Sequence, residues 1–218
     1  MLKKGDKKLI NAWAFYDWAN SVYSLVIGTA VFPLYYSNIT EGATVSFLGT
    51  TWEHPDTLYS YALSFSFLVV AFMSPILSAI ADYTGNKKRF LQIFCWIGSL
   101  SVMSLYFFDG IDTVWIGIVF TILASIGFWS SIVFYNAYLP EVAFPEDQDR
   151  VSAKGFILGY LGSVILLVIN LGMILKPELL GITSGTASQI SFVMVGLWWL
   201  GFAQITFRRL PNNIFDKK

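Results

Sequence analysis

Residues Ser78–Arg89 read S-A-I-A-D-Y-T-G-N-K-K-R and lie between two long apolar runs. So short a polar stretch predicts a tight hairpin, and Gly85 supplies the positive φ angle that such a reversal needs. The cationic cluster Lys87–Arg89 marks this side of a bilayer as cytoplasmic. Asp82 is predicted at the C-terminal end of the preceding helix, where the helix dipole disfavours a negative charge. We therefore expect Asp82 to have a partner, either these cations or the positively polarised N-terminus of another helix.

The composition on both sides of this hairpin is typical of an integral membrane protein. The 218 residues are 56% hydrophobic and 13% charged, whereas soluble domains average about 45–50% apolar and about 25% charged residues. The single cysteine, Cys95, cannot form an intrachain disulfide, and the single histidine, His54, has no Cys or His neighbour with which to bind zinc. The formal net charge is zero. We expect no metal, no cofactor and no nucleic acid partner.

Six apolar runs are long enough to cross a bilayer as helices. A spanning helix needs about 20 mostly apolar residues, whereas a barrel strand needs only about 9–11 alternating ones. Because the runs are continuous and have the greater length, the sequence predicts an all-α membrane protein. The predicted helices cover Ala14–Tyr36, Leu58–Ala81, Phe90–Phe108, Val114–Tyr138, Gly155–Leu175 and Gln189–Phe207.

The basic residues predict how these helices are oriented. With the N-terminus inside, every Lys and Arg except Lys176 falls in a cytoplasmic segment, as the positive-inside rule requires. Both termini are therefore predicted to be cytoplasmic, and the Lys- and Asn-rich ends and compact loops favour a bacterial inner membrane. Leu139–Ala153 is then an inner loop, and Ser37–Thr57 is the longest outer loop.

The first predicted helix carries a polar face. Asp17, Asn20, Ser21, Ser24 and Gly28 recur at i, i+3, i+4, i+7 and i+11 and so share one side of a helix. An ionisable group at membrane depth is costly and is by default a functional candidate. Asp17 is also expected only about one turn from the cytoplasmic end, where water and the helix N-terminus would stabilise a negative charge without any function. The sequence alone leaves both interpretations open.

Other predicted helices carry scattered polar residues. The candidate pathway for solute and ions consists of Asp17, Asn20, Ser24, Trp129, Asn136 and Asn170. Taken singly, each side chain beyond the first helix is more simply explained by hydrogen bonds between helices. Taken together, the polar faces indicate a hydrophilic passage. The spacing of Gly155, Gly159 and Gly162 predicts close approach of another helix rather than a binding site.

The inner connections bring opposite charges to one side of the predicted bundle. Glu141 and Arg150 flank the fourth and fifth helices on the side where the hairpin lies. A network of ion pairs there would hold this side closed. The candidate gate comprises Asp82, Gly85, Lys87, Lys88, Arg89, Glu141 and Arg150. The alternative is a solvated loop, whose ion pairs contribute only about 0–1 kcal/mol each.

The hairpin resembles a signature of major facilitator superfamily transporters, which reads G-x-x-x-D-[RK]-x-G-[RK]-[RK] between their second and third helices. Asp82, Gly85 and Lys87 match this signature. It is not matched at Ser78, Tyr83 and Asn86. Further stretches are similar to one branch of the superfamily, the vacuole effluxer (autophagy-related permease) family. They are Trp13–Ser21, Asn136–Glu141, Arg150–Gly155 and Gly159–Gly162.

The resemblance implies a transporter that is driven by protons or another gradient, with amino-acid export as the family's activity. Such transporters have two six-helix halves, with the solute bound between them. Residues 1–207 would be the N-terminal half, residues 208–218 the start of the central cytoplasmic loop or a tail, and the partner of Asp82 would lie in the other half. The implied partners are the lipid bilayer, a small solute, protons and a second six-helix half. That half would come from a longer product, a split gene or a second copy.

Two other functional classes were weighed against a transporter. A membrane-embedded enzyme is not favoured, because no Ser/His, Cys/His or metal-ligand constellation occurs at membrane depth. A six-helix scaffold or assembly subunit without transport activity of its own fits the length of the chain, and it stands as the alternative.

Overall fold

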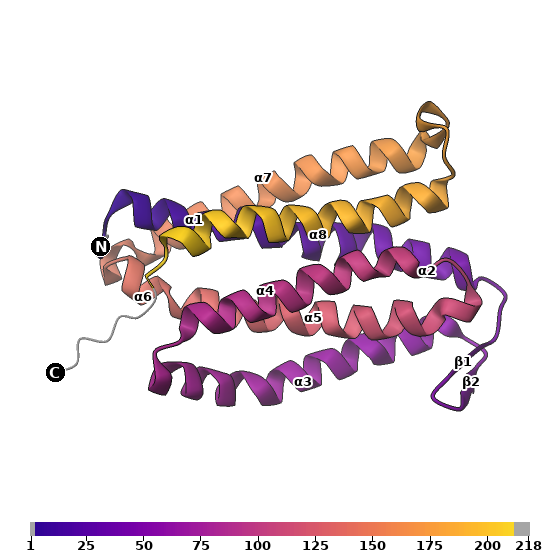
Figure 1. Ribbon diagram of the computed structural model, residues 1–218, viewed down its shortest axis with the longest axis horizontal. Helices are drawn as coiled ribbons and strands as arrows, with labels where there is room; N and C mark the ends of the chain where they lie inside the picture. The colour runs from indigo at the N-terminus through magenta and orange to yellow at the C-terminus, as the bar shows by residue number, and fades with distance from the viewer. Residues whose placement is uncertain (1–2, 212–218) are drawn as a thin grey trace.

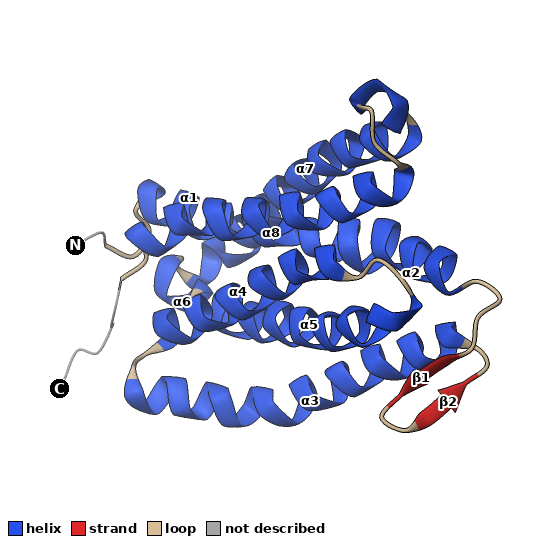
Figure 2. Cartoon of the chain, turned by 45° about the vertical axis from the view of Figure 1, so that its right-hand side comes forward, coloured by secondary structure: helices blue, strands red, loops and turns tan. Residues whose placement is uncertain are grey.

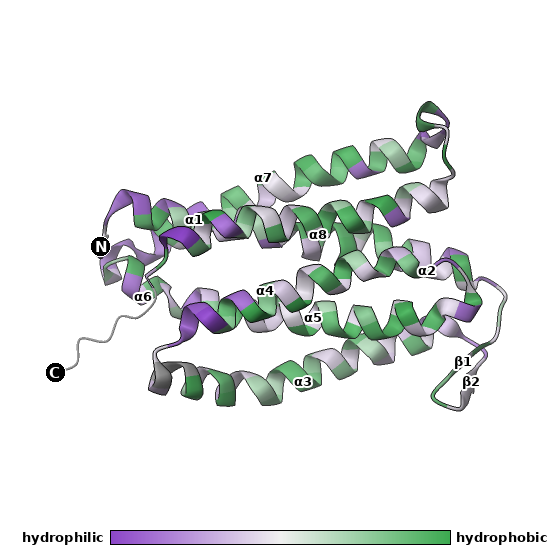
Figure 3. Cartoon of the chain, viewed as in Figure 1, coloured by the Kyte–Doolittle hydropathy of each residue, from purple (hydrophilic) through white to green (hydrophobic). Residues whose placement is uncertain are grey.

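The computed structural model describes residues 3–211, apart from the side chains of Ala81, Asp82 and Thr84. Within these residues, six helical segments are long and apolar enough to cross a membrane, which confirms the predicted all-α membrane fold. Figure 1 shows an elongated bundle in which the first helix begins and the last helix ends at the same end. Hydrophobic residues follow the helices and hydrophilic residues gather toward the ends of the bundle (Figure 3).

The first span consists of three consecutive segments rather than one regular α-helix. α1 (Lys7–Val22) is capped by Asp6, whose carboxylate accepts a hydrogen bond from the backbone N–H of Lys8 at 2.7 Å. A π-helix of nine residues, η1 (Tyr23–Val31), follows, and α2 (Phe32–Thr40) completes the span. The span therefore begins earlier and ends later than predicted. Hydropathy does not detect such polar ends, although they continue the helix.

The predicted hairpin is confirmed. The helix before it ends at Thr84, Gly85 adopts a φ of 68°, and the next helix begins at Lys87. Pro75 lies inside the helix before the hairpin without ending it. The remaining long helices are α3 (Pro55–Thr84), α4 (Lys87–Ser104), α5 (Val114–Ala137), α7 (Gln148–Leu175) and α8 (Ser184–Arg209).

The connections are more ordered than the predicted loops. The predicted long outer loop contains a small antiparallel hairpin of β1 (Val45–Phe47) and β2 (Thr50–Trp52), drawn in red in Figure 2. The predicted inner loop is largely helical, because its polar residues continue helical hydrogen bonding that hydropathy cannot detect. It contains α6 (Leu139–Val142), η4 (Pro145–Asp147) and the start of α7. The other short helices are η2 (Leu105–Phe107), η3 (Ile111–Thr113) and η5 (Pro177–Leu180).

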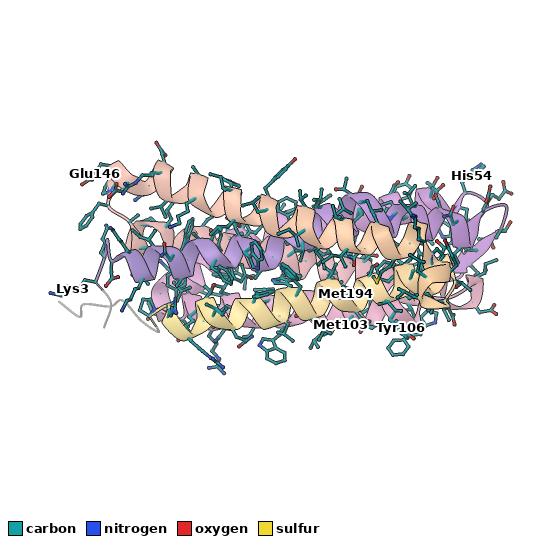
Figure 4. The ribbon with its side chains drawn as sticks, turned by 90° about the horizontal axis from the view of Figure 1, so that it is seen from above. Lys3, His54, Met103, Tyr106, Glu146 and Met194 are labelled. Atoms are coloured by element: carbon teal, nitrogen blue, oxygen red, sulfur yellow. The ribbon has the colours of Figure 1, made fainter. Side chains whose placement is uncertain are left out.

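Packing between the long helices follows a repeat. The first span packs through α1 against α7 and α8, α5 packs against α3 and α4, and α4 packs against α8. The first, second and third spans make the same kinds of contact as the fourth, fifth and sixth: α1 corresponds to α5, α3 to α7, and α4 to α8. Such a correspondence is expected for two inverted repeats of three helices. Figure 4 shows Lys3 and Glu146 at one end of the bundle and His54 and Tyr106 at the other, so successive connections alternate between the ends.

The closest helix packing is centred on α4. A Cβ atom on Gly98 would overlap the ring of Trp199 on α8, and a Cβ atom on Gly127 of α5 would overlap the backbone of Gly98. By contrast, α3 lies at the edge of the bundle, because only 6% of its most apolar window is buried, against 44% for α8. The core thus leaves α3 available to contact lipid or another protein.

Candidate functional site

A carboxylate lies inside the bundle on α1. Asp17 follows the first residue of α1 by ten positions, which is roughly 15 Å along a helix, and it is only 9% exposed. Stabilisation by the helix N-terminus does not apply at this depth, because that effect is confined to the first turn. The hydroxyl of Tyr135 on α5 donates to Asp17 Oδ2 at 2.9 Å. Among the described residues, no Lys or Arg pairs with this carboxylate.

Tyr135 is held in place by α1 itself. Its ring stacks on Trp13, with 4.2 Å between the ring centroids and 11° between the planes. The indole N–H of Trp13 also donates to the Tyr135 carbonyl at 2.9 Å. Because Trp13 and Asp17 are one helical turn apart, α1 fixes both the ring and the hydroxyl of Tyr135. The Asp17–Tyr135 pair therefore joins the first and fourth spans.

Two glycines of α7 make room for α1, and the first of them, Gly155, faces the Asp17–Tyr135 pair. A Cβ atom on Gly155 would lie 2.5 Å from Asp17 Oδ2 and 2.8 Å from the Tyr135 hydroxyl, and one on Gly159 would lie 2.5 Å from Ser21 Oγ. The glycine spacing in the fifth helix was predicted to be a packing seam, and the structure confirms close packing against α1. This seam also adjoins the buried carboxylate.

The polar face of α1 opens into a cleft of about 450 Å³ between α1, α5 and α7. We call it the polar cleft. It is lined by Asp17, Asn20, Ser21, Ser24, Leu25, Thr29, Phe128, Trp129, Ile132, Phe156, Tyr160 and Ser163. Asn20 is 1% exposed; its Oδ1 lies 3.4 Å from the Ser21 hydroxyl, and its Nδ2 makes no hydrogen bond with any described residue. A buried amide donor and a carboxylate thus belong to the same polar cleft.

A smaller cavity of about 100 Å³ adjoins the polar cleft toward the end where α1 begins. Asn136 and Ser152 line it, and it shares Asp17, Ile132 and Phe156 with the polar cleft. The carboxylate of Asp17 therefore lies between the two cavities. Two predicted pathway residues, Trp129 and Asn136, are brought to opposite sides of it.

The π-helix changes which residues of the first span face the polar cleft. The predicted face ended at Gly28, but Thr29 occupies the lining position instead. Thr29 Oγ1 donates to the carbonyl of Ser24 at 2.9 Å, five residues earlier. This shift follows from the wider turn of a π-helix, whose hydrogen bonds join residues five apart. Single π-helical turns inside α-helices are frequent at functional sites.

Asn170 does not line the polar cleft. Its side chain on α7 is fully buried, and neither of its amide atoms makes a hydrogen bond with a described residue. Ser163, one heptad earlier on α7, lines the polar cleft instead. The predicted placement of Asn170 in the passage therefore stays a prediction. Spacing along the helix did not reveal that this side chain is fully buried.

The candidate gate is divided among several contacts. Lys87 at the start of α4 pairs with Glu141 on α6, with 3.0 Å between Nζ and Oε1. The ammonium group of Lys88 donates to the carbonyl of Leu210 at 2.9 Å, which ties the start of α4 to the end of α8. Arg150 is not part of this group, because it pairs within its own turn with Asp147 at 2.8 Å.

Two further residues of the candidate gate are Asp82 and Arg89. The side chain of Asp82 lies outside the described residues, so its predicted partner stays a prediction. Arg89 lines a separate cleft between α4 and α8.

Tyr135 is the most important residue that sequence reasoning missed. Its pairing with Asp17 spans 118 residues of sequence. The available signal was indirect: Gly155 begins a small-residue seam, and such a seam leaves room for whatever the facing helix carries. Thr29 was missed as a lining residue because of the π-helix, and Ser163 was not among the predicted pathway residues.

Comparison with known proteins gives a consistent result. A family model described as "Vacuole effluxer Atg22 like" matches residues 5–218. The "Uncharacterized MFS-type transporter YxiO" of Bacillus subtilis is 36% identical over 220 residues, which cover 100% of this chain and 50% of that protein. "Autophagy-related protein 22" of Pyricularia oryzae is 26% identical over 65% of this chain and 28% of its own length.

A protein of Aquifex aeolicus is 25% identical over 95% of this chain and 47% of its own length. The chain thus spans about half the length of the bacterial relatives that it matches. No solved structure matches it significantly.

Proposed function

Since this chain belongs to the Vacuole effluxer Atg22 like family, we propose that it forms the N-terminal six-helix half of a secondary active transporter working by alternating access. Its relatives include an MFS-type transporter, and its six spanning segments make it an integral membrane protein. We propose a small polar solute as its cargo, with amino-acid export as the first activity to test. An enzymatic activity is not part of this proposal.

The observation that supports this proposal most strongly is the Asp17–Tyr135 pair at the wall of the polar cleft. An ionisable group inside a membrane bundle is costly, and such groups mark solute, ion and proton pathways. Asp17 would take up a proton while the cleft faces one compartment and release it when the cleft faces the other. The Tyr135 hydroxyl would hold the carboxyl group at the junction of the two cavities in the meantime.

The polar cleft would be completed by a second six-helix bundle. In transporters of this architecture, the solute binds near the bilayer midplane between the two halves. The helices that border the open side, α3 and α7, expose large apolar side chains such as Phe65, Phe72, Phe156 and Tyr160. These would contact the other half, which is encoded by the same reading frame beyond Lys218, by a neighbouring one, or by a second copy of this chain.

The inner gate is proposed at the end of the bundle where α1 begins. The Lys87–Glu141 pair joins α4 to α6 there, and Asp82, Gly85 and Lys88 lie in or beside the same hairpin. Arg89 and Arg150 contribute positive charge at this end without joining that pair. By the positive-inside rule, this end and both termini are proposed to be cytoplasmic, in a bacterial inner membrane.

The test is gradient-coupled transport in liposomes. The chain is reconstituted alone and together with its proposed second half, a trapped pH-sensitive dye reports proton movement, and a panel of single amino acids supplies the solute. We expect a solute-dependent proton flux only when both halves are present. Asp17→Asn should abolish this flux while leaving expression and assembly intact. The matched control is Asp56→Asn, because Asp56 lies near the opposite end of the bundle and binds Ser37 at 2.6 Å.

The outcomes separate the proposal from its alternative. Unchanged flux in Asp17→Asn would refute the role of the carboxylate. A stable two-half complex with no flux of any solute in the panel, in either direction, would favour the scaffold or assembly subunit.

A further inference from the structure

A second cleft, of about 520 Å³, lies between α4 and α8. We call it the rear cleft. It is lined by Arg89, Gln92, Ile93, Trp96, Ile97 and Gln204. All lining residues come from the first turns of α4 and the last turns of α8, so the rear cleft occupies the end of the bundle where α1 begins. Figure 1 shows both of these helix ends at the same end of the bundle as the start of α1.

The rear cleft is separate from the polar cleft. It shares no lining residue with the polar cleft, which is built by α1, α5 and α7. In the repeat described above, α4 and α8 occupy equivalent places behind the helices that build the polar cleft. A second bundle that completes the polar cleft therefore leaves the rear cleft exposed to lipid.

The rear cleft has unpaired positive charge at its mouth. Arg89 forms no ion pair with any described residue, and neither does Arg208. On α4, Arg89, Gln92 and Trp96 are spaced at i, i+3 and i+7, so they share one face. On α8, Arg208 follows Gln204 by four residues and so shares its face. Arg89 thus lines the opening itself, and Arg208 is placed by helical spacing one turn beyond the lining residue Gln204.

The wall deeper in the rear cleft is apolar. Trp96 is 47% exposed and Ile93 is 43% exposed, and Trp96 lies roughly 10 Å from Arg89 along α4. Along α4, the hydrogen bond from Lys88 to Leu210 precedes these lining residues, and the close contact of Gly98 with Trp199 follows them. Along α4, the lining side chains therefore change from a cation (Arg89) to an amide (Gln92) and then to apolar groups (Ile93 and Trp96).

We propose that the rear cleft binds an anionic phospholipid of the leaflet at this end of the bundle. Its phosphate would accept hydrogen bonds from Arg89 and Arg208, its glycerol region would meet Gln92 and Gln204, and one acyl chain would lie along Trp96 and Ile93. Guanidinium groups match phosphate geometry, and basic pockets between spanning helices are known places for anionic headgroups. A free phosphate ion would use the arginines but not the apolar wall.

The test is lipid binding to the purified chain in detergent, followed by native mass spectrometry. Phosphatidylglycerol and phosphatidylcholine with identical acyl chains are titrated in parallel. We expect a preference for phosphatidylglycerol. Arg89→Gln and Arg208→Gln should each weaken phosphatidylglycerol binding about fivefold and leave phosphatidylcholine binding unchanged. The charge-matched control is Arg150→Gln, an exposed cation at the same end that already pairs with Asp147.

Three results would overturn the proposal. One is the absence of any headgroup preference in the unmodified chain, a measurement that needs no variant. Another is an equal loss of phosphatidylglycerol binding in Arg150→Gln, which would indicate general surface charge. The third is displacement of the lipid by glycerol phosphate at comparable concentration, since this would identify a site for free phosphate. Trp96→Ala should weaken both lipids together, because it removes wall that any acyl chain would contact.

Discussion

The polar cleft and the rear cleft both contain ionisable side chains at or near membrane depth, but they satisfy these charges differently. In the polar cleft, Asp17 is 9% exposed and its partner, Tyr135, belongs to the protein. Arg89 of the rear cleft and Arg208, one helical turn beyond its lining residue Gln204, are exposed and have no ion-pair partner among the described residues. The carboxyl group of Asp17 has a hydrogen-bond donor within the fold, whereas the two arginines have no ion-pair partner among the described residues.

This difference indicates what each cleft is able to do. A buried group with an internal partner changes its environment only if the helices that carry the two partners move or if a proton is exchanged. That behaviour suits a transport cycle. An exposed cation beside an apolar wall responds to the membrane around it and needs no movement of the bundle. The two clefts should therefore respond independently to substitution.

The largest expected effect comes from removing the internal partner in the polar cleft. Tyr135→Phe deletes the hydroxyl that donates to Asp17 and leaves a buried carboxyl group without it, which costs about 1–3 kcal/mol. For a chain of this size, the melting temperature should fall by roughly 3–10 °C, and proton-coupled flux should fall with it. Thermal unfolding in detergent and the liposome assay measure the two effects.

The control for this substitution is Tyr35→Phe. Tyr35 is also buried, but its hydroxyl donates to a neutral group, the carbonyl of Phe108, at 2.6 Å. It should lower stability by about 0.5–1.5 kcal/mol and leave the proton coupling intact. Lipid binding in the rear cleft should be unchanged in both variants. A loss of headgroup preference in Tyr135→Phe would show that the two clefts are not independent.

A smaller effect is expected from filling the space beside the carboxylate. In Gly155→Ala, the new methyl group meets the ends of two side chains, Asp17 and Tyr135. Because side-chain ends shift more easily than backbone, the cost should lie near the lower limit of overpacking, about 1 kcal/mol. Gly172→Ala on the same helix is the control, since no atom lies within 4 Å of its added Cβ. Equal melting temperatures for the two variants would contradict the proposed contact.

Part of this architecture was predictable because it depends on local properties of the sequence. Hydropathy identified six spans, and helical spacing placed Asp17, Asn20 and Ser24 on one face, as the polar cleft confirms. The positive φ of Gly85 followed from the brevity of the hairpin. Each of these features depends on residues within a few turns of one another.

The remaining features depend on packing between distant segments. Tyr135 reaches Asp17 across 118 residues, and no pattern within α5 distinguishes it from the aromatic residues around it. The π-helix lies in an ordinary apolar run, so its effect at Thr29 had no local signal. Asn170 has the period of a cleft-lining residue and is nevertheless fully buried. Whether such a side chain faces a cleft or is buried depends on which helices pack together, and the sequence of a single helix does not determine that packing.

The smallest expected effect concerns the ion pair that links the walls of the two clefts. Lys87 begins α4, which lines the rear cleft, and Glu141 lies on α6, directly after the helix that lines the polar cleft. Both side chains are about one-fifth exposed, at 20% and 22%. Pairs in water contribute about 0–1 kcal/mol, so a double-mutant cycle of Lys87→Gln and Glu141→Gln should give a coupling energy near the upper end of this range. The cycle of Arg150→Gln and Asp147→Asn should give almost none, since Arg150 is 77% exposed. Equal coupling in the two cycles would mean that Lys87 and Glu141 form an ordinary surface pair, and the proposed gate would then lose its energetic basis.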